Sequence, residues 1–315
     1  MTQPILETIA AGVRSRTAFY IDGETMRAVL DAGVGVGSRF EIGLEIPFLL
    51  HSGGGVDSFI ESYHDRFGFP DGGRPAFVSD RFAVGYVGDG ESVFIDRAPG
   101  GFHLGDVVLS GRAGLVRGDR RRPAVAASAS VKLPTGDPGD MFGSGSTDYG
   151  VSILVTQPLG RTTLHGGYAF TAVGEWETAP ELPLSDSRSL FLAYAFAATP
   201  RTTLIGQWLR SSGPFQFRSG NDLGRVANEV AVGFRHLNRH DLALEWAFIE
   251  NLNGDFNTPD VGIFVGLSLR PGAGPPSGPI RGDGLQVHEA KRLTRGSGGL
   301  GAESAGRRAG PQPGG

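Results

Sequence analysis

The chain has 315 residues, of which 51 are glycine and none is cysteine, and its formal net charge at pH 7 is −4. The lack of cysteine excludes a disulfide scaffold and cysteine-ligated metal sites, and the near-balanced charge offers no basic face for nucleic acid. No apolar run is long enough for a helical membrane span, so a soluble protein and a transmembrane β-barrel both remain open.

The first residues carry no recognisable export signal. After Met1 the chain continues Thr2-Gln3-Pro4, with neither a positively charged segment nor an apolar core. If the protein is exported, we expect the signal to lie upstream of this start or to have been removed.

Strict two-residue alternation of apolar and polar residues is the main signal along the chain. It is clearest in residues 39–49, 122–133, 240–250 and 260–269. Successive side chains of a strand point to opposite faces, so each of these segments would have one apolar and one polar face.

The alternating segments are long. An ordinary strand has about five or six residues, whereas a tilted membrane-spanning strand needs about nine to eleven. The predicted strands are 25–36, 39–49, 102–116, 122–133, 146–157, 161–172, 186–198, 201–211, 226–237, 240–250 and 260–269. With a further strand near 12–21 they number about 12, and bacterial outer-membrane barrels favour even numbers.

The connections between these segments alternate between short and long. The short links lie at 37–38, 116–121, 158–160, 199–200 and 238–239, and the long ones at 50–101, 134–145, 173–185, 212–225 and 251–259. Short turns on one rim and long loops on the other are typical of an antiparallel up-and-down barrel inserted from the periplasm. The sequence therefore predicts an all-β transmembrane barrel over 1–270, with both chain ends on the short-turn side.

Two regions are not expected to form barrel wall. Within the 50–101 excursion, Phe59, Ile60, Tyr63 and Phe67 have helical spacing, and a hairpin of about 77–86 and 91–96 follows. The helix would close the mouth, rest on the membrane surface, or simply pack an extracellular loop. Residues 271–315 are rich in Gly, Pro and Arg, and we expect them to be disordered.

Several short motifs resemble those of an uncharacterised outer-membrane β-barrel family, domain-of-unknown-function family 3187. The motifs are residues 21–25 (IDGET), 41–47 (EIGLEIP), 51–54 (HSGG), 56–61 (VDSFIE), 69–73 (FPDGG), 132–137 (KLPTGD) and 143–148 (GSGSTD). The resemblance covers roughly residues 20–270 and implies an outer-membrane barrel of a Gram-negative bacterium. It implies no catalytic residues.

The last predicted strand resembles the terminal signal that barrel-assembly machinery reads. Its residues are Asp260, Gly262, Val265 and Leu267. Val265 stands where an aromatic residue is common, and a long tail follows. The resemblance implies the assembly machinery as a partner, besides outer-membrane lipid.

Charged residues recur on the polar face of the predicted strands. The lumen-lining candidates are Arg27, Asp31, Glu41, Glu45, Asp106, Arg112, Lys132, Asp148, Glu229, Arg235 and Glu245, seven acids and four bases. An Arg or Lys facing lipid at mid-depth would cost about 2–4 kcal/mol, which favours an inward position. The set would line a water-filled pathway, or would form interior ion pairs that stiffen the barrel and leave little passage.

Other chemistry has weaker support. His51 and Ser52 stand at a strand end, as in outer-membrane lipid hydrolases, yet neighbours on a strand point to opposite faces. The histidines show no metal-binding spacing, and no cofactor motif is present.

Three functions therefore remain open. They are a conduit for a small-molecule solute, a closed structural or surface-interaction barrel that binds through 50–101, and a membrane-embedded lipid hydrolase.

Overall fold

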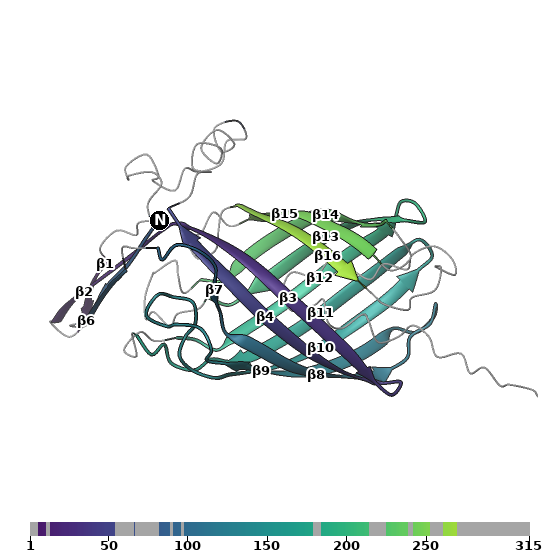
Figure 1. Ribbon diagram of the computed structural model, residues 1–315, viewed down its shortest axis with the longest axis horizontal. Helices are drawn as coiled ribbons and strands as arrows, with labels where there is room; N and C mark the ends of the chain where they lie inside the picture. Colours follow the sequence, from purple (N-terminus) through teal and green to yellow (C-terminus); the bar gives the residue numbers. More distant parts are fainter. Residues whose placement is uncertain are drawn as a thin grey trace, which may run out of the picture.

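A computed structural model shows two antiparallel β-sheets in the part of the chain that it describes (Figure 1). The structure describes residues 6–10, 13–53, 66, 82–88, 91–95, 98–178, 184–213, 225–238, 242–252 and 261–269. Side chains are described from residue 23 onward within these ranges, except at 86–88 and 91–93.

The larger sheet, which we call the wall, runs as β16-β15-β14-β13-β12-β11-β10-β9-β8-β4-β3, with β7 (His103–Leu104) paired to β4. Its strands are β3 (Glu24–Val36), β4 (Phe40–Ser52), β8 (Val107–Val116), β9 (Ala124–Leu133), β10 (Asp148–Leu159), β11 (Thr162–Ala172), β12 (Ser187–Ala197), β13 (Thr202–Ser211), β14 (Ala227–Leu237), β15 (Leu242–Asn251) and β16 (Val261–Leu269). The 12 strands, β7 included, confirm the predicted all-β antiparallel sheet and its approximate size.

The links of the wall alternate in length as the sequence predicted. Tight turns connect β3 to β4 and β10 to β11, where Gly37 and Gly160 have φ of 63° and 69°. Glycine suits these positions because a side chain disfavours left-handed backbone. The long connections, among them 53–106 and 134–147, leave from the opposite end of the wall.

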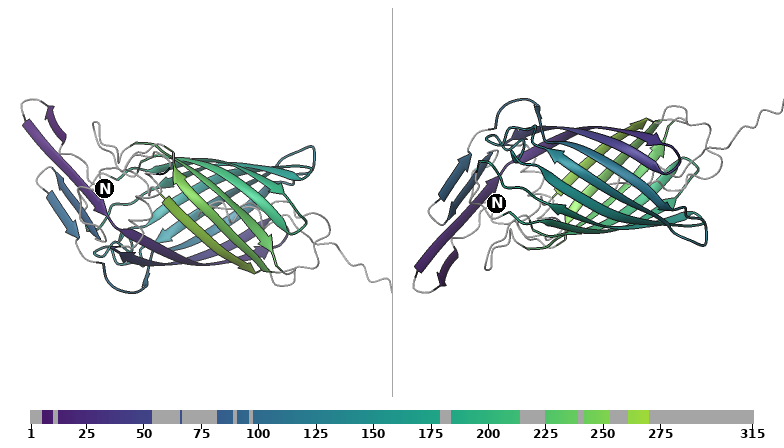
Figure 2. Two further views of the ribbon diagram at one scale, coloured as in Figure 1. Left: turned by 90° about the horizontal axis from the view of Figure 1, so that it is seen from above. Right: turned by 90° about the horizontal axis from the view of Figure 1, so that it is seen from below.

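The wall is strongly curled, and its inner face surrounds an interior (Figures 1 and 2). Among the described strands, β3 and β16 are the two edges of the sheet, and no pairing joins them. Because every neighbouring pair on the 11-strand path (12 less β7) is antiparallel, β3 and β16 run in the same direction.

The smaller sheet, which we call the rim sheet, has the order β1-β2-β5-β6 and stands beside the long-loop end of the wall (Figure 2). Its strands are β1 (Leu6–Ala10), β2 (Val13–Asp22), β5 (Ala83–Gly88) and β6 (Glu91–Ile95). The predicted hairpin of the 50–101 excursion is thus present as β5 and β6, although its first strand begins at residue 83 rather than 77.

The position of β2 differs from the prediction that 12–21 is the first wall strand. Gly23, with φ of 149°, separates β2 from β3 and lets the chain leave the wall, and β5 then pairs with residues 18–22. With β2 in the rim sheet, the N-terminal part of the chain reaches β3 from beside the long-loop end, whereas the sequence predicted both chain ends on the short-turn side. A cluster of Phe82, Val84, Ile95 and Trp176 packs the rim sheet against the loops of the wall.

Some predictions fall outside the described residues. They are the helix carrying Phe59, Ile60, Tyr63 and Phe67, the tail 271–315, and Asp260 of the terminal motif. Within the part of the chain that is described, no helix has the length and apolar character needed to cross a membrane.

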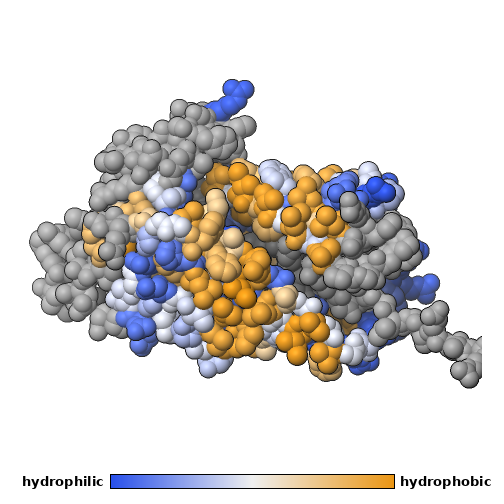
Figure 3. Space-filling view, in the orientation of Figure 1, coloured by the Kyte–Doolittle hydropathy of each residue, from blue (hydrophilic) through white to orange (hydrophobic). Residues whose placement is uncertain are grey.

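The outer face of the wall is apolar and exposed. On β10, Tyr149, Val151, Ile153 and Val155 are exposed and alternate with inward residues. On β16 the outward Leu267 is 73% exposed. The outward apolar side chains form a broad band across the wall (Figure 3). Soluble monomers rarely expose a contiguous apolar patch of more than a few hundred Å², so this face needs an apolar neighbour.

Candidate functional site

The inner face of the wall gathers the charged residues that the sequence singled out. Nine of the eleven candidates form ion pairs with one another, as Arg27–Glu45, Arg112–Glu41, Arg235–Glu245, and Lys132 with both Asp106 and Asp148. All four bases are therefore paired. Alternation predicted the face on which these residues lie, and the structure supplies their partners.

Three of the pairs join residues directly opposite each other on adjacent strands. Arg112 on β8 faces Glu41 on β4 at 3.2 Å, and Arg235 on β14 faces Glu245 on β15 at 3.5 Å. Lys132 on β9 faces Asp148 on β10 at 2.9 Å. These pairs therefore extend along the wall between neighbouring strands.

Lys132 lies at the centre of a network at the long-loop end. Its Nζ is 3.0 Å from Asp106 Oδ2, and it also donates to the Ser144 hydroxyl. Asp106 accepts hydrogen bonds from the backbone N–H of Gly136 and of Ser144, both at 3.0 Å. Asp148 accepts from the N–H of Gly174 at 2.9 Å. One cation thus fixes the start of β8, the 134–147 loop and the loop after β11.

The other ion pairs lie at different depths. The Arg27 guanidinium is 2.5 Å from Glu45 Oε1, and the Arg112–Glu41 and Arg235–Glu245 pairs lie nearer the tight turns. Glu245 is 1% exposed, so its charge is held almost wholly inside the protein. Of the two remaining candidates, Asp31 stands opposite Glu45 in the β3–β4 register, and Glu229 lies at the long-loop end of β14.

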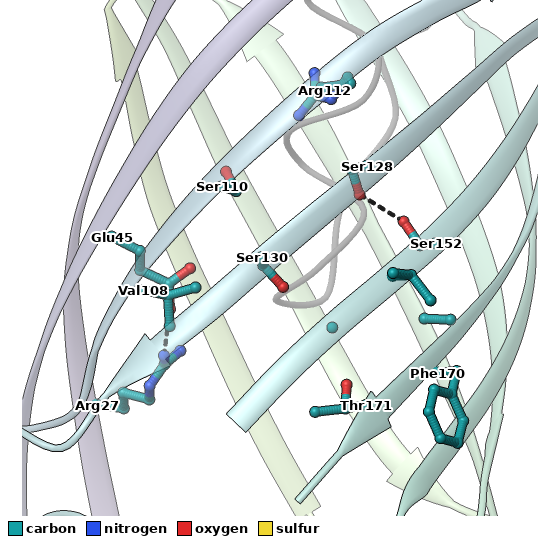
Figure 4. A pocket seen from close by; sticks show the side chains of 13 residues that line it. Arg27, Glu45, Val108, Ser110, Arg112, Ser128, Ser130, Ser152, Phe170 and Thr171 are labelled. Carbon is teal, nitrogen blue, oxygen red and sulfur yellow. Dashed lines mark hydrogen bonds and ion pairs between the residues drawn. The ribbon is translucent and has the colours of Figure 1, made fainter. Parts of the chain in front are cut away.

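A cavity of about 350 Å³ opens on this face between β3 and β11 (Figure 4). Five hydroxyl side chains, of Ser110, Ser128, Ser130, Ser152 and Thr171, line it. Ser128 and Ser152 are joined by a hydrogen bond of 2.7 Å between their hydroxyl oxygens.

The charged residues on the lining are Arg27, Glu45 and Arg112. Sequence reasoning missed the hydroxyl side chains, because serine in a polar register is common. Their recurrence at inward positions of β8, β9 and β10 was the available signal.

The opposite part of the interior is more apolar. Ala195, Ile205 and Ala247 form a buried cluster, against which Phe264 packs. This part of the interior thus combines alanine methyl groups with the buried polar side chains of Thr203, Gln207 and Ser268.

His51 takes part in aromatic packing at the long-loop end. Its ring stacks between those of Phe82 and Phe142, at centroid distances of 5.0 and 4.8 Å, and Phe142 also stacks on His103 at 4.4 Å. His51 Nε2–H donates to the Met141 carbonyl, and Nδ1 accepts from the Thr25 hydroxyl. Nε2 thus helps to hold the 134–147 loop, while Nδ1 ties the ring to β3.

Within the described ranges, no group of three or more His, Asp or Glu side chains is arranged to hold a metal ion.

Comparisons with known proteins give a family and a number of distant structural likenesses, of which two are described here. An outer membrane channel from Pseudomonas putida F1 is 13% identical over 84% of this chain and 90% of that chain, with a TM-score of 0.49. An anion-selective porin from Comamonas acidovorans is 14% identical over 83% of this chain and 90% of that chain, with a TM-score of 0.28. No curated protein matches. Residues 3–270 match the family described as "Protein of unknown function (DUF3187)", and the chain belongs to that family.

Proposed function

We propose that this protein is an outer-membrane β-barrel of a Gram-negative bacterium that conducts small polar solutes. The exposed apolar side chains of the outer face are suited to lipid, and the charged and hydroxyl groups lie on the other face of the same strands. A lipid-facing sheet cannot leave open edges in hydrocarbon, because each unsatisfied backbone group there costs several kcal/mol. We therefore propose that the wall is closed in the membrane and encloses a lumen.

The direction of the ion pairs favours a pathway over a plugged interior. Arg112–Glu41, Lys132–Asp148 and Arg235–Glu245 each join residues that are neighbours in the sheet. Pairs of this kind run along the wall and do not cross the interior, whereas a plug made of ion pairs needs contacts between opposite sides. The cavity beside Ser128 and Ser152 is consistent with this arrangement.

Conductance in planar bilayers tests this function. The refolded full chain should give stable channel currents, and a bulky inward residue should reduce them. Ser152→Trp places an indole in the lumen, while Val151→Trp places one on the adjacent, 57% exposed outward position.

We expect a clear loss of single-channel conductance for Ser152→Trp only. A folded protein, identified by its heat-modifiable migration in gels, that carries no current would contradict the proposal. So would equal conductances of the two variants.

The remaining partners follow from this function. The terminal strand, with Gly262, Val265 and Leu267, would be read by the barrel-assembly machinery together with Asp260. The 50–101 excursion would stand on the cell surface. Replacing Val265 by Phe should then raise the yield of assembled barrel in cells, because an aromatic residue is the commoner one at that place.

A further inference from the structure

We infer that the cavity between β3 and β11 is a solute subsite for small uncharged molecules with several hydroxyl groups, such as polyols. This inference rests on the proposed function, because the solute must enter the lumen. Its basis is the chemistry of the lining, which the ion pairs and the hydroxyl side chains determine together.

The charges on the lining do not favour an ion. Arg27 lies 2.5 Å from Glu45, and Arg112 lies 3.2 Å from Glu41. At such distances the two opposite charges of a pair cancel each other's electric field a short way from the pair. A passing ion or zwitterion would lose water and gain only hydroxyl contacts, and burying a charge without a partner is costly.

The hydroxyl groups suit a solute that both donates and accepts hydrogen bonds. Each serine or threonine hydroxyl offers one donor and two acceptor sites. Ser110 and Ser130 stand opposite each other in the β8–β9 register, and Ser128 and Ser152 do so in the β9–β10 register. The four groups form a compact patch that can bind neighbouring hydroxyls of one polyol.

The space for the solute depends on Gly150. A Cβ at this position would lie 2.5 Å from Ser130 Oγ, so any side chain would displace that hydroxyl. The resulting cavity of about 350 Å³ is at the small end of ligand pockets, which span roughly 300–1,000 Å³.

Liposome swelling with xylitol, and with betaine as a lighter zwitterion with the same number of carbon atoms, tests the subsite. Xylitol should enter faster than betaine. The double variant Ser128→Ala/Ser152→Ala removes both partners of one hydrogen bond, a change that leaves stability nearly unchanged. It should slow xylitol roughly two- to ten-fold, as expected for one lost hydrogen bond, and leave betaine unchanged. The matched control Thr203→Ala/Ser268→Ala removes two buried hydroxyls that do not line the cavity.

The possible outcomes separate the two proposals. If neither solute enters, the proposed conduit is wrong. If betaine enters as fast as xylitol, or the cavity variant and the control behave alike, the conduit stands and the polyol subsite is wrong.

The two edge strands of the wall, β3 and β16, lead to a second, independent inference. We propose that β2 has a second position in which it closes the wall between β3 and β16. These edges run in the same direction, so an all-antiparallel closure needs one more strand running the opposite way. Bacterial barrels have even numbers of strands, and β2 would raise the 11 wall strands to 12.

The sequence at the β2–β3 junction fits this second position. Asp22-Gly23 is a favoured two-residue hairpin turn, because glycine readily adopts the left-handed backbone that such a turn needs. In the register that this turn sets, residues whose numbers sum to 45 face each other. Arg14 then takes the register position opposite Asp31. The positions of β2 that alternate with Arg14 hold Val13, Ser15, Thr17, Phe19 and Ile21, which carry no charge.

Cysteine pairs test this position directly, because the chain has no native cysteine. Thr17→Cys with Ala28→Cys pairs β2 with β3 in the wall. The matched pair Ala18→Cys with Val87→Cys follows the rim-sheet register.

Oxidation in outer membranes should give an intramolecular disulfide in the wall pair. A disulfide in the rim pair alone would overturn the proposal. A covalent dimer from the wall pair would also overturn it, because the closing strand would then belong to a second copy.

Discussion

At the scale of single residues, alternation predicted which face carries the charged side chains but could not predict their partners. Lys132 and Asp106 are 26 positions apart, and the course of the loops between the strands brings them into contact. The hydroxyl cavity was missed for a similar reason, since a serine on a strand indicates no binding site until its neighbours across the sheet are known. Pairing in a sheet depends on register, which period-two patterning does not contain.

Lys132 should be the most costly of the inward charges to remove. Lys132→Met leaves Asp106 and Asp148 facing each other without their shared cation. Removing one partner of a buried ion pair typically lowers the free energy of unfolding by about 3–5 kcal/mol. Because Lys132 is partly exposed, we expect a loss near the lower end of this range. Urea unfolding in lipid vesicles measures it.

Lys132→Arg keeps the charge and is the control for this change. If the methionine variant is no less stable than the arginine variant, the network around Lys132 is not held by charge.

At the scale of elements, the wall strands and the β5–β6 hairpin follow from the sequence. Long alternating segments have few alternatives to a half-buried strand. The rim sheet could not be predicted, because β2 reads equally well as a wall strand and its placement depends on a distant partner, β5. The sequence predicted a long connection at 134–145 but not its conformation, because the stacking of His51, Phe142 and His103 that fixes it joins distant parts of the chain.

Phe142 should determine the order of the 134–147 loop. Its ring is 2% exposed and stacks on two histidine rings. Phe142→Ala should lower the free energy of unfolding by about 3–5 kcal/mol, as truncation of other buried aromatic rings does. Hydrogen exchange should become faster within 134–147 and stay unchanged in β12–β13. Unaltered exchange in the loop would show that the Asp106 hydrogen bonds hold it unaided.

At the scale of the whole molecule, the apolar band predicts a dependence on depth in the membrane. Ile153 and Leu159 are both outward on β10, one in the middle of the strand and one at its end. Arginine at mid-depth of a barrel costs about 2–4 kcal/mol, and near the interface about 0–1 kcal/mol.

Ile153→Arg should therefore destabilise the vesicle-embedded protein much more than Leu159→Arg, as measured by the free energy of unfolding. Equal effects would mean that the band does not lie in lipid.

The charges along the interior also differ from one end to the other. The Arg112–Glu41 and Arg235–Glu245 pairs near the tight turns are neutral, whereas Lys132 at the long-loop end is outnumbered by Asp106, Asp148 and Glu229. In the conduit that we propose, a potassium ion arriving from the long-loop end would meet this excess of acidic side chains, and one arriving from the other end would not. The current–voltage curve of an oriented protein in potassium chloride should therefore rectify, and Glu229→Gln with Asp148→Asn should make it more symmetric.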